Sequence, residues 1–504
     1  PYIMIFFKYK KQQSFIIIKE VFFLTGILLL FFACNSTDNS KEKKTNPTSP
    51  NFILILADDQ GWNGTSVKMM NNEPGSKSDY FETPNLELLS QRGMRFSDAY
   101  SSAPVCAPSR YSIQFGKTPA RLSLIRVGMN TDHIDHEGFT SIPKALKTIN
   151  SKYRTAHFGK WGMDSNPESV GYDFSDGATK NKDGIFNWSS NKLQWSNNID
   201  DDPKKIFSLA EKAVSFLDQQ KKSKKPFFLQ VSHYAVHTNI ISKEETHKKY
   251  LGKDKTRSTD NAGFAAMTEN LDEGLGIILD KLEELNLTDN TYIIYTSDNG
   301  SVPTIPAKRY YKESINFPLS RGKWDAMEGG IRVPFIVSGP GIQKMSESKV
   351  PVVGYDLLPT IIDLAGSDIQ NKEDIDGGSF KKILLSGKDV EINRHYPGII
   401  FHVPYENKIA LARAHSSIIK NNFKLIKFRN NNELVLYDID NDFMEAENLL
   451  EQYPELTDEL ESLLDGYLFK FKSLKWQNGI NWKNVNVNKA VSYTHLRAHE
   501  TRGN

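Results

Sequence analysis

Two pairs of polar residues follow apolar runs at points where a metal ion could bind. Asp58-Asp59 comes directly after one run, and Asp298-Asn299 comes directly after another. Neighbouring carboxylates at the end of a buried strand repel each other unless a cation compensates their charge. Three carboxylates and one amide oxygen suit a hard cation such as Ca²⁺ or Mg²⁺. The sequence therefore predicts a divalent metal at these four residues.

A cysteine lies in a string that also carries chemistry. Cys106-Ala107-Pro108-Ser109-Arg110 is followed by Gly116 and Lys117. By itself, a cysteine is often no more than a small buried apolar residue. This string, however, resembles the maturation signature of the type I, formylglycine-dependent sulfatases, in which a separate maturase oxidises the cysteine. The resemblance implies that Cys106 is converted to 3-oxoalanine (formylglycine).

The resemblance runs through residues 50–450, with the family's motifs in the family's order. Besides the cysteine string and the two metal motifs, it includes residues 82–86, 93–96, 159–161, 226–229, 236–237, 321–323, 328–334, 356–360, 376–377, 424–425 and 436–438.

The same resemblance implies roles for single residues. By position, Lys160, His237 and Lys323 correspond to the residues that bind sulfate and serve the leaving group. Arg110 corresponds to the residue that steadies the formylglycine and the metal. The resemblance also implies that the metal is Ca²⁺, and that Cys106 joins the four predicted oxygen ligands.

One position departs from the family pattern. The family has a histidine directly after Gly-Lys-Trp, and Gly162 stands there in this chain. That histidine is normally assigned to the proton transfer that expels sulfate. In an extended stretch, His157 points to the face opposite Lys160, so we expect it to pack within the sheet. His133 and His136 are further candidates, and the sequence does not choose among them.

The elements that must position these residues follow an alternating pattern. Apolar runs at residues 52–56, 226–231, 292–296 and 333–337 alternate with helical patterns such as 201–217 and 263–285. Alternation of this kind predicts an α/β fold with a mostly parallel sheet covered by helices on both faces. Ligands bind at the carboxyl ends of such strands, where both metal motifs fall. The resemblance implies an alkaline-phosphatase-like sheet.

After Gly366, the predicted helices and strands become shorter. Residues 423–428 and 433–437 are typical of a hairpin, and residues 454–471 of a helix. We therefore predict a sulfatase catalytic domain at residues 51–375 and a smaller C-terminal α+β subdomain at residues 376–490. Residues 491–504 read as a translated sequencing adapter, so their two histidines are excluded as metal ligands.

The N-terminal residues are typical of a targeting segment. Lysines precede an apolar run at residues 21–32, which is too short to span a bilayer and which ends at Ala33-Cys34. This pattern resembles the lipobox of bacterial lipoproteins, so residues 1–34 are expected to be a signal peptide with lipid on Cys34. Residues 35–50 are then a flexible tether. The alternatives for this segment are an ordinary cleaved signal and a retained anchor. For the two cysteines, a disulfide between Cys34 and Cys106 is a further possibility in an exported protein.

Charge and motifs together indicate a function. The 63 basic and 61 acidic residues are interspersed, which gives no electrostatic footprint for nucleic acid. The resemblance implies an exported, periplasmic or cell-surface enzyme that hydrolyses sulfate monoesters, on sulfated carbohydrates, through the gem-diol of formylglycine. One alternative is a phosphoester hydrolase of the same superfamily, in which serine or threonine would replace Cys106. Another is a catalytically silent glycan-binding protein, which Gly162 alone favours.

Overall fold

The computed structural model describes residues 49–185, 194–368, 372–407, 409, 413–485 and 487. The expected signal segment with Cys34, nearly all of the tether and the tail at 491–504 lie outside the described residues. Within the described part of the chain, every helix is too short or too polar to cross a membrane.

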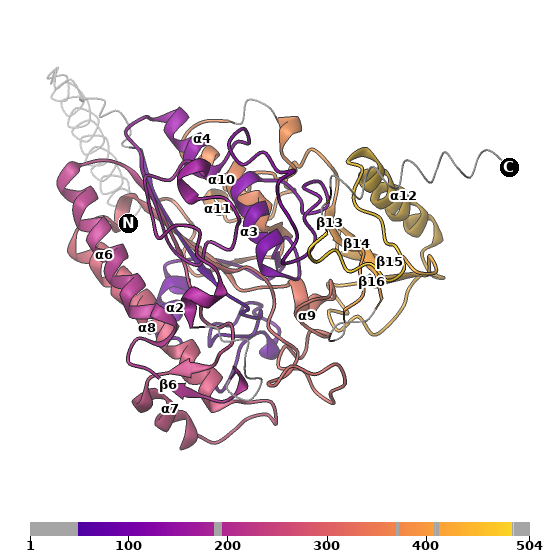
Figure 1. The fold of residues 1–504 in the computed structure, drawn as a ribbon, viewed down its shortest axis with the longest axis horizontal. Coiled ribbons are helices and arrows are strands. Elements are labelled where there is room, and N and C mark those ends of the chain that lie inside the picture. Colours follow the sequence, from indigo (N-terminus) through magenta and orange to yellow (C-terminus); the bar gives the residue numbers. More distant parts are fainter. Residues whose placement is uncertain are drawn as a thin grey trace, which may run out of the picture. The chain divides into compact units, whose positions relative to one another are not determined.

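An eight-stranded sheet forms the centre of the described chain (Figure 1). Its strands lie in the order β11 (Ser346–Ser348), β2 (Gly93–Phe96), β10 (Phe335–Ser338), β9 (Thr291–Ser297), β1 (Asn51–Ala57), β7 (Phe227–Ser232), β4 (Arg154–Gly159) and β5 (Phe174–Ser175). Five of the seven neighbouring pairs are parallel. β10 is antiparallel to both β9 and β2. The predicted mostly parallel sheet is confirmed, and the run expected at 333–337 is its one antiparallel strand among those described.

The central strand β1 is buried on both faces. Phe52, Leu54 and Leu56 pack into one core, whereas Ile53 and Ile55 pack into the other. Because side chains alternate along a strand and both faces are covered here, the run is continuously apolar.

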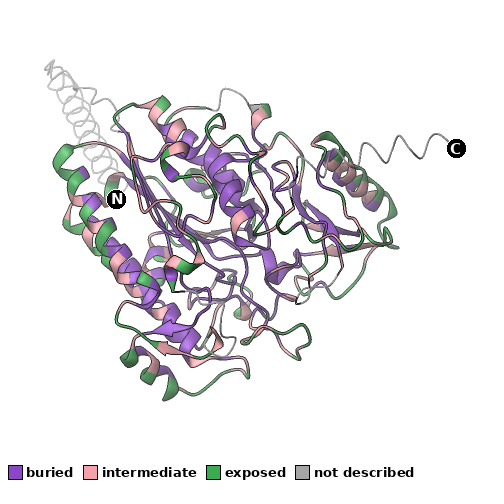
Figure 2. Ribbon diagram, viewed as in Figure 1, coloured by how far each residue is buried: buried purple, intermediate pink, exposed green. Residues whose placement is uncertain are grey.

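Helices cover the two faces of the sheet, and their buried sides face it while their outer sides are exposed (Figure 2). One core is shared by α2 (Pro84–Gln91), α6 (Ile206–Ser223) and α8 (Ala262–Glu284). The other is shared by α3 (Cys106–Phe115), α4 (Ile142–Ile149), α10 (Leu357–Leu364) and α11 (Lys381–Ser386). The short helix α7 (Glu244–Leu251) packs on α8.

A four-stranded antiparallel sheet and a helix follow. The sheet has the order β13 (Ile399–Val403), β14 (His415–Lys420), β15 (Phe423–Phe428) and β16 (Leu434–Asp438), and α12 (Pro454–Lys470) packs on it through Leu460, Leu464 and Tyr467. The predicted hairpin and C-terminal helix are thus confirmed to within one or two residues.

Smaller elements complete the fold. β12 (Val352–Val353) pairs with β3 (Ala99–Tyr100), β6 (Asn198–Ile199) pairs with β8 (Ile241–Ser242), and α9 (Glu328–Ile331) is a single turn. Helix α6 begins later than expected, at Ile206 instead of residue 201. The reason is a 3₁₀ turn at Pro203–Lys205 that separates Asp202 from the helix. Asp202 Oδ1 then caps the helix by accepting hydrogen bonds from the N–H groups of Phe207 and Ser208.

Candidate functional site

The carboxyl ends of four neighbouring strands place the predicted residues at one edge of the sheet. Asp58 and Asp59 follow β1, Asp298 and Asn299 follow β9, and Lys160 follows β4. Cys106 and Arg110 come from the first turns of α3, His237 from the loop after β7, and Lys323 from the loop before α9. The structure brings all nine side chains together, and every one of them is buried. This is the edge at which ligands collect in parallel sheets.

Each carboxylate of the cluster is matched by a cation. Lys160 Nζ lies 2.6 Å from Asp58 Oδ2, and Lys323 Nζ lies 2.7 Å from both carboxylate oxygens of Asp59. Arg110 donates from Nε to Asp298 Oδ2 at 2.8 Å. These three cations offset the three negative charges that would otherwise be buried without compensation.

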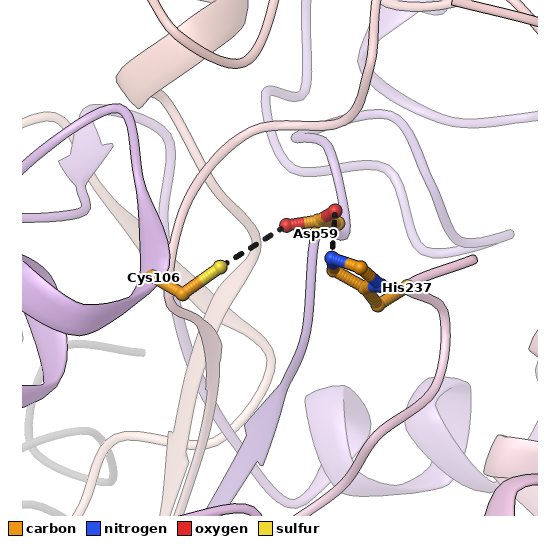
Figure 3. Close-up of side chains that lie close together, drawn as sticks. All are labelled: Asp59, Cys106 and His237. Carbon is orange, nitrogen blue, oxygen red and sulfur yellow. Dashed lines mark hydrogen bonds and ion pairs between the residues drawn. The ribbon is translucent and has the colours of Figure 1, made fainter. Parts of the chain in front are cut away.

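Asp59 is the carboxylate nearest to the predicted nucleophile. Figure 3 shows it between Cys106 and His237, with Oδ1 3.8 Å from Cys106 Sγ and Oδ2 3.7 Å from His237 Nε2. Its backbone is left-handed (φ 62°), and its N–H donates to Asp298 Oδ1 at 3.1 Å. Asn299 Nδ2 donates to Asp59 Oδ1 at 2.7 Å. The β1 and β9 motifs are therefore locked to each other directly.

The oxygen atoms of this cluster fit a divalent cation. Ligand atoms of Asp58, Asp59, Cys106 and Asp298 all lie within 4.8 Å of one another. In addition, Asp58 Oδ1 and Asn299 Oδ1 are buried and accept no hydrogen bond from any described residue. Buried acceptors without partners are rare in proteins and call for an explanation. A hard cation that prefers oxygen ligands would supply the missing partner for both atoms.

The cations keep the carboxylates ionised despite their burial. Burial alone would raise the pKa of Asp58, but the nearby cations, Lys160 above all and also Arg110, hold the pKa below its usual value. Burial is likewise opposed at Asp59, where Lys323 lowers the pKa. Both groups are therefore anionic at neutral pH, which is the form that a metal binds.

Cys106 is a poor nucleophile as an unmodified thiol. Burial raises its pKa to about 12, even though Lys160 and Lys323 act in the opposite direction. Lys323 Nζ lies 3.6 Å from the sulfur. Because the thiolate and not the thiol attacks, this side chain is unreactive at neutral pH in its unmodified form.

The rest of the cysteine string has structural roles. Ser109 Oγ donates to the carbonyl of Ala103 and accepts from its N–H, both at 3.0 Å, which fixes the turn that leads into α3. Gly116 ends α3 in the left-handed region (φ 63°), where a residue without Cβ is favoured.

His237 is neutral in this structure. Burial lowers its pKa to about 4, although Asp59 acts to raise it. Nδ1 lies 2.6 Å from the carbonyl of Thr238, which as an acceptor requires the proton on Nδ1. Nε2 therefore faces Asp59 as an acceptor.

The histidine missing from the family pattern is not replaced by the candidates considered from sequence. His157 is fully buried within the sheet, 3.1 Å from Ser232 Oγ, as expected for a packing residue. His133 Nε2 contacts the carbonyl of Leu122, and His136 Nε2 lies 3.0 Å from the hydroxyl of Tyr111. Neither ring is part of the carboxylate cluster.

Gly162 itself is fixed by its surroundings. Its φ of +71° is one that side-chain-bearing residues rarely adopt, and a Cβ there would lie 2.8 Å from Arg110 Cδ. Beside it, a cavity of about 360 Å³ opens over Cys106 and Lys160, lined also by Tyr111, Arg126 and Lys182.

One buried cation was missed by the sequence prediction. Lys204 is 1% exposed, and the charges that act on its ammonium are those of Asp58, Lys160 and Asp59. In sequence, Pro203-Lys204-Lys205 is indistinguishable from a solvated turn before a helix, so no signal marks it.

Comparison with known proteins identifies the family. Residues 50–367 match the family model described as sulfatase, and residues 323–468 match that described as N-sulphoglucosamine sulphohydrolase, C-terminal. A sulfatase of Formosa agariphila is 27% identical over 498 residues, which covers 82% of this chain and 87% of the relative. The ulvan-active sulfatase of the same species is 26% identical over 395 residues, covering 73% and 71%.

Solved structures agree with the fold. The crystal structure of Ps i-CgsB, which has also been solved in complex with k-i-k-neocarrahexaose, matches with a TM-score of 0.68 and 25% identity over 88% of this chain and 97% of that one. The phosphonate monoester hydrolase of Agrobacterium radiobacter matches with a TM-score of 0.60 and 17% identity over 84% and 95%, a likeness of fold alone. Because the sulfatase model spans more than half of the 504 residues, the chain belongs to the sulfatase family and is a sulfuric ester hydrolase with an alkaline-phosphatase-like fold.

Proposed function

We propose that this sulfatase cleaves sulfate monoesters of sulfated carbohydrates with a formylglycine made from Cys106. The observation that carries the proposal is the position of Cys106, a buried thiol that stays protonated and yet faces Asp59 and the Lys323 ammonium. Hydrated formylglycine would supply an oxygen nucleophile there, together with a neighbouring hydroxyl that allows sulfate to be released.

The metal in this proposal is held by Asp58, Asp59, Asp298 and Asn299, with the modified Cys106 as a further ligand. We assign Ca²⁺ rather than Mg²⁺ to this site. A metal ion bound there would polarise the sulfuryl oxygens and stabilise an ionised nucleophile. Arg110 would hold Asp298 in place through its 2.8 Å hydrogen bond.

The remaining cations have roles in the transition state. Negative charge develops on the sulfuryl group and on the departing oxygen, and fixed positive charges in a closed site stabilise it. Lys160 and Lys323 supply two such charges. We assign His237 Nε2 to the leaving oxygen. The negative charge of a bound sulfate ester favours protonation of this ring, and the protonated Nε2 can then hydrogen-bond or give a proton to that oxygen.

The relatives and the cavity support sulfated glycans as the substrate class. One relative is described as active on ulvan, and Ps i-CgsB has been solved with a neocarrahexaose. The cavity over Cys106 is lined by Arg126, Lys180 and Lys182. Its lining also includes Asp164, which pairs with Lys180 at 2.8 Å, and the remaining excess of positive charge favours an anionic glycan. An exported lipoprotein anchored through Cys34, which a maturase processes at Cys106, would meet such polymers outside the cell. A cysteine at position 106 favours sulfate over phosphate esters.

Peptide mass spectrometry across Cys106 tests the proposal, using protein co-expressed with a formylglycine-generating maturase. We expect the mass loss of a thiol-to-aldehyde conversion and turnover of a generic aryl sulfate, both absent from a Cys106→Ala variant. A Cys106 that stays a thiol beside a competent maturase would contradict the proposed nucleophile.

A further inference from the structure

Lys204 lies at the edge of the sheet where the site is built. α6 ends at Ser223 and leads within a few residues into β7, so its first turn lies at the carboxyl end of that strand. Leu209 of α6 packs against Gly159, since its Cδ1 would be 3.1 Å from a Cβ at that glycine, and Lys160 is the next residue. The chain just before Lys204 is also held near the site, because β6 (Asn198–Ile199) pairs with β8 (Ile241–Ser242), which follows His237 by a few residues.

The side chain of Lys204 is buried in a place that does not favour a cation. It is 1% exposed and comes just before the first turn of α6, where the helix dipole favours anions. Its backbone is left-handed (φ 56°), which the capping of α6 by Asp202 explains, but that capping does not require a lysine. Lys205 is also left-handed (φ 58°) and points to solvent.

Lys204 differs from the other cations of the site in lacking a carboxylate. Arg110, Lys160 and Lys323 each pair with an aspartate at 2.6 to 2.8 Å. Among the described residues, none makes a hydrogen bond or an ion pair with the Lys204 ammonium. A buried charge without a partner is unfavourable unless a ligand compensates it. Burial lowers the pKa of Lys204 to about 7, with Lys160 adding to this effect and Asp58 and Asp59 opposing it.

We propose that Lys204 is a further sulfate-binding residue, whose ammonium contacts the sulfuryl group or the ester oxygen of the bound substrate. It provides a positive charge in a chain where the family's histidine position is Gly162. This inference rests on the proposed sulfate-ester site, and it adds to that site a contact from the start of α6.

The test compares Lys204→Met with the matched control Lys205→Met, the adjacent exposed lysine of the same backbone conformation. Binding of inorganic sulfate is measured by calorimetry and as inhibition of aryl sulfate hydrolysis, and unfolding midpoints are measured by heating. We expect Lys204→Met to bind sulfate about tenfold more weakly or worse, as loss of a charge-assisted contact implies. Lys205→Met should stay within about twofold of the wild type, as an exposed charge implies.

The unfolding midpoint separates a binding role from a structural one. Removal of an unpaired buried cation should leave the midpoint of Lys204→Met equal to or above that of the wild type. Weaker sulfate binding together with a lower midpoint assigns Lys204 a structural role and overturns the proposal. Unchanged sulfate binding in Lys204→Met overturns it while leaving the proposed function intact. A wild-type protein that neither binds sulfate nor hydrolyses aryl sulfate overturns both.

Discussion

Lys323 and Asp59 form the ion pair nearest to Cys106, with the ammonium 2.7 Å from both carboxylate oxygens and 3.6 Å from the sulfur. Burial alone would lower the pKa of Lys323, but Asp59 raises it above its ordinary value. This ammonium is therefore a permanent positive charge beside the reacting position.

Replacement of Lys323 by methionine should reduce both catalysis and stability. We expect kcat/KM for an aryl sulfate to fall roughly 10² to 10³-fold, as for loss of one preorganised donor. The unpaired Asp59 should destabilise the metal-free fold by about 3 to 5 kcal/mol, and Ca²⁺ should restore most of this. The exposed Lys308 provides the control, since Lys308→Met should alter neither quantity. Equal stability of Lys323→Met and wild type in EDTA would argue against the ion pair.

Metal removal should lower stability by an amount that depends on ion concentration. A cation that binds only the folded state adds about 2.7 kcal/mol at a hundred times its Kd. We therefore expect the unfolding midpoint in EDTA to rise on addition of Ca²⁺, and to rise less with Mg²⁺. Asp59→Asn should abolish the rise, whereas Asp254→Asn, an exposed acidic position, should retain it. A midpoint that is insensitive to Ca²⁺ in the wild type rules out the proposed metal site.

Much of the fold could be predicted because its signals are local. Apolar runs marked β1, β7 and β9 to within a residue or two, since strands buried on both faces are mostly apolar. The antiparallel direction of β10 could not be predicted, because an apolar run is the same in both directions. The late start of α6 depends on the left-handed pair Lys204-Lys205, whose backbone conformation is unusual for lysine.

The site was predictable where residue types are chemically restricted. Asp58-Asp59 was predicted because adjacent carboxylates need compensation, and Asp298-Asn299 because it also directly follows an apolar run. Lys204 was missed because burial of a single lysine depends on tertiary packing. The reason for Gly162 is likewise tertiary, since it is Arg110, 52 residues earlier, that occupies the space a side chain would need.

Restoration of the family's histidine should therefore fail. In Gly162→His, the left-handed backbone and the 2.8 Å approach of Arg110 Cδ to the new Cβ would displace the guanidinium from Asp298. We expect Gly162→His to lower stability without any gain in aryl sulfate turnover. Gly162→Ala, with a smaller side chain, should also lower stability. Gly177 is a matched control, because it is also left-handed (φ +82°) and no atom lies within 4 Å of the position that a Cβ would take there. Gly177→Ala should show the backbone cost alone, about 1 kcal/mol. Higher turnover in Gly162→His would show that Arg110 can move aside without loss of activity, and would contradict this prediction.

Acid should destabilise the protein through histidines that are buried outside the metal cluster. Burial lowers the pKa of His157 and His402 to about 3 and that of His415 to about 4. His402 is held neutral by its contacts, 2.7 Å to Ser416 Oγ and 2.6 Å to the carbonyl of Leu474. Because each folded-state pKa lies below the unfolded value of about 6.5, this stability is present above pH 6.5 and is lost as the pH falls toward the folded-state values of about 3 to 4.

The expected slope makes this prediction quantitative. Each of the three rings takes up about one proton on unfolding in that range, so together they should lower the free energy of unfolding by about 4 kcal/mol per pH unit between pH 6 and 5. His233 and His237, whose pKa values burial also lowers to about 4, add to the slope in the same direction. Urea unfolding across that interval measures it. His402→Gln should reduce the slope by about 1 kcal/mol per pH unit, since the uptake of one proton is removed. His395→Gln, at an exposed position, should leave the slope unchanged. The buried contacts of His157 to Ser232, and of His402 to Ser416 and the Leu474 carbonyl, favour neutral rings in the folded protein. A wild-type slope near zero would contradict this, since it would mean that the rings are already charged when the protein is folded.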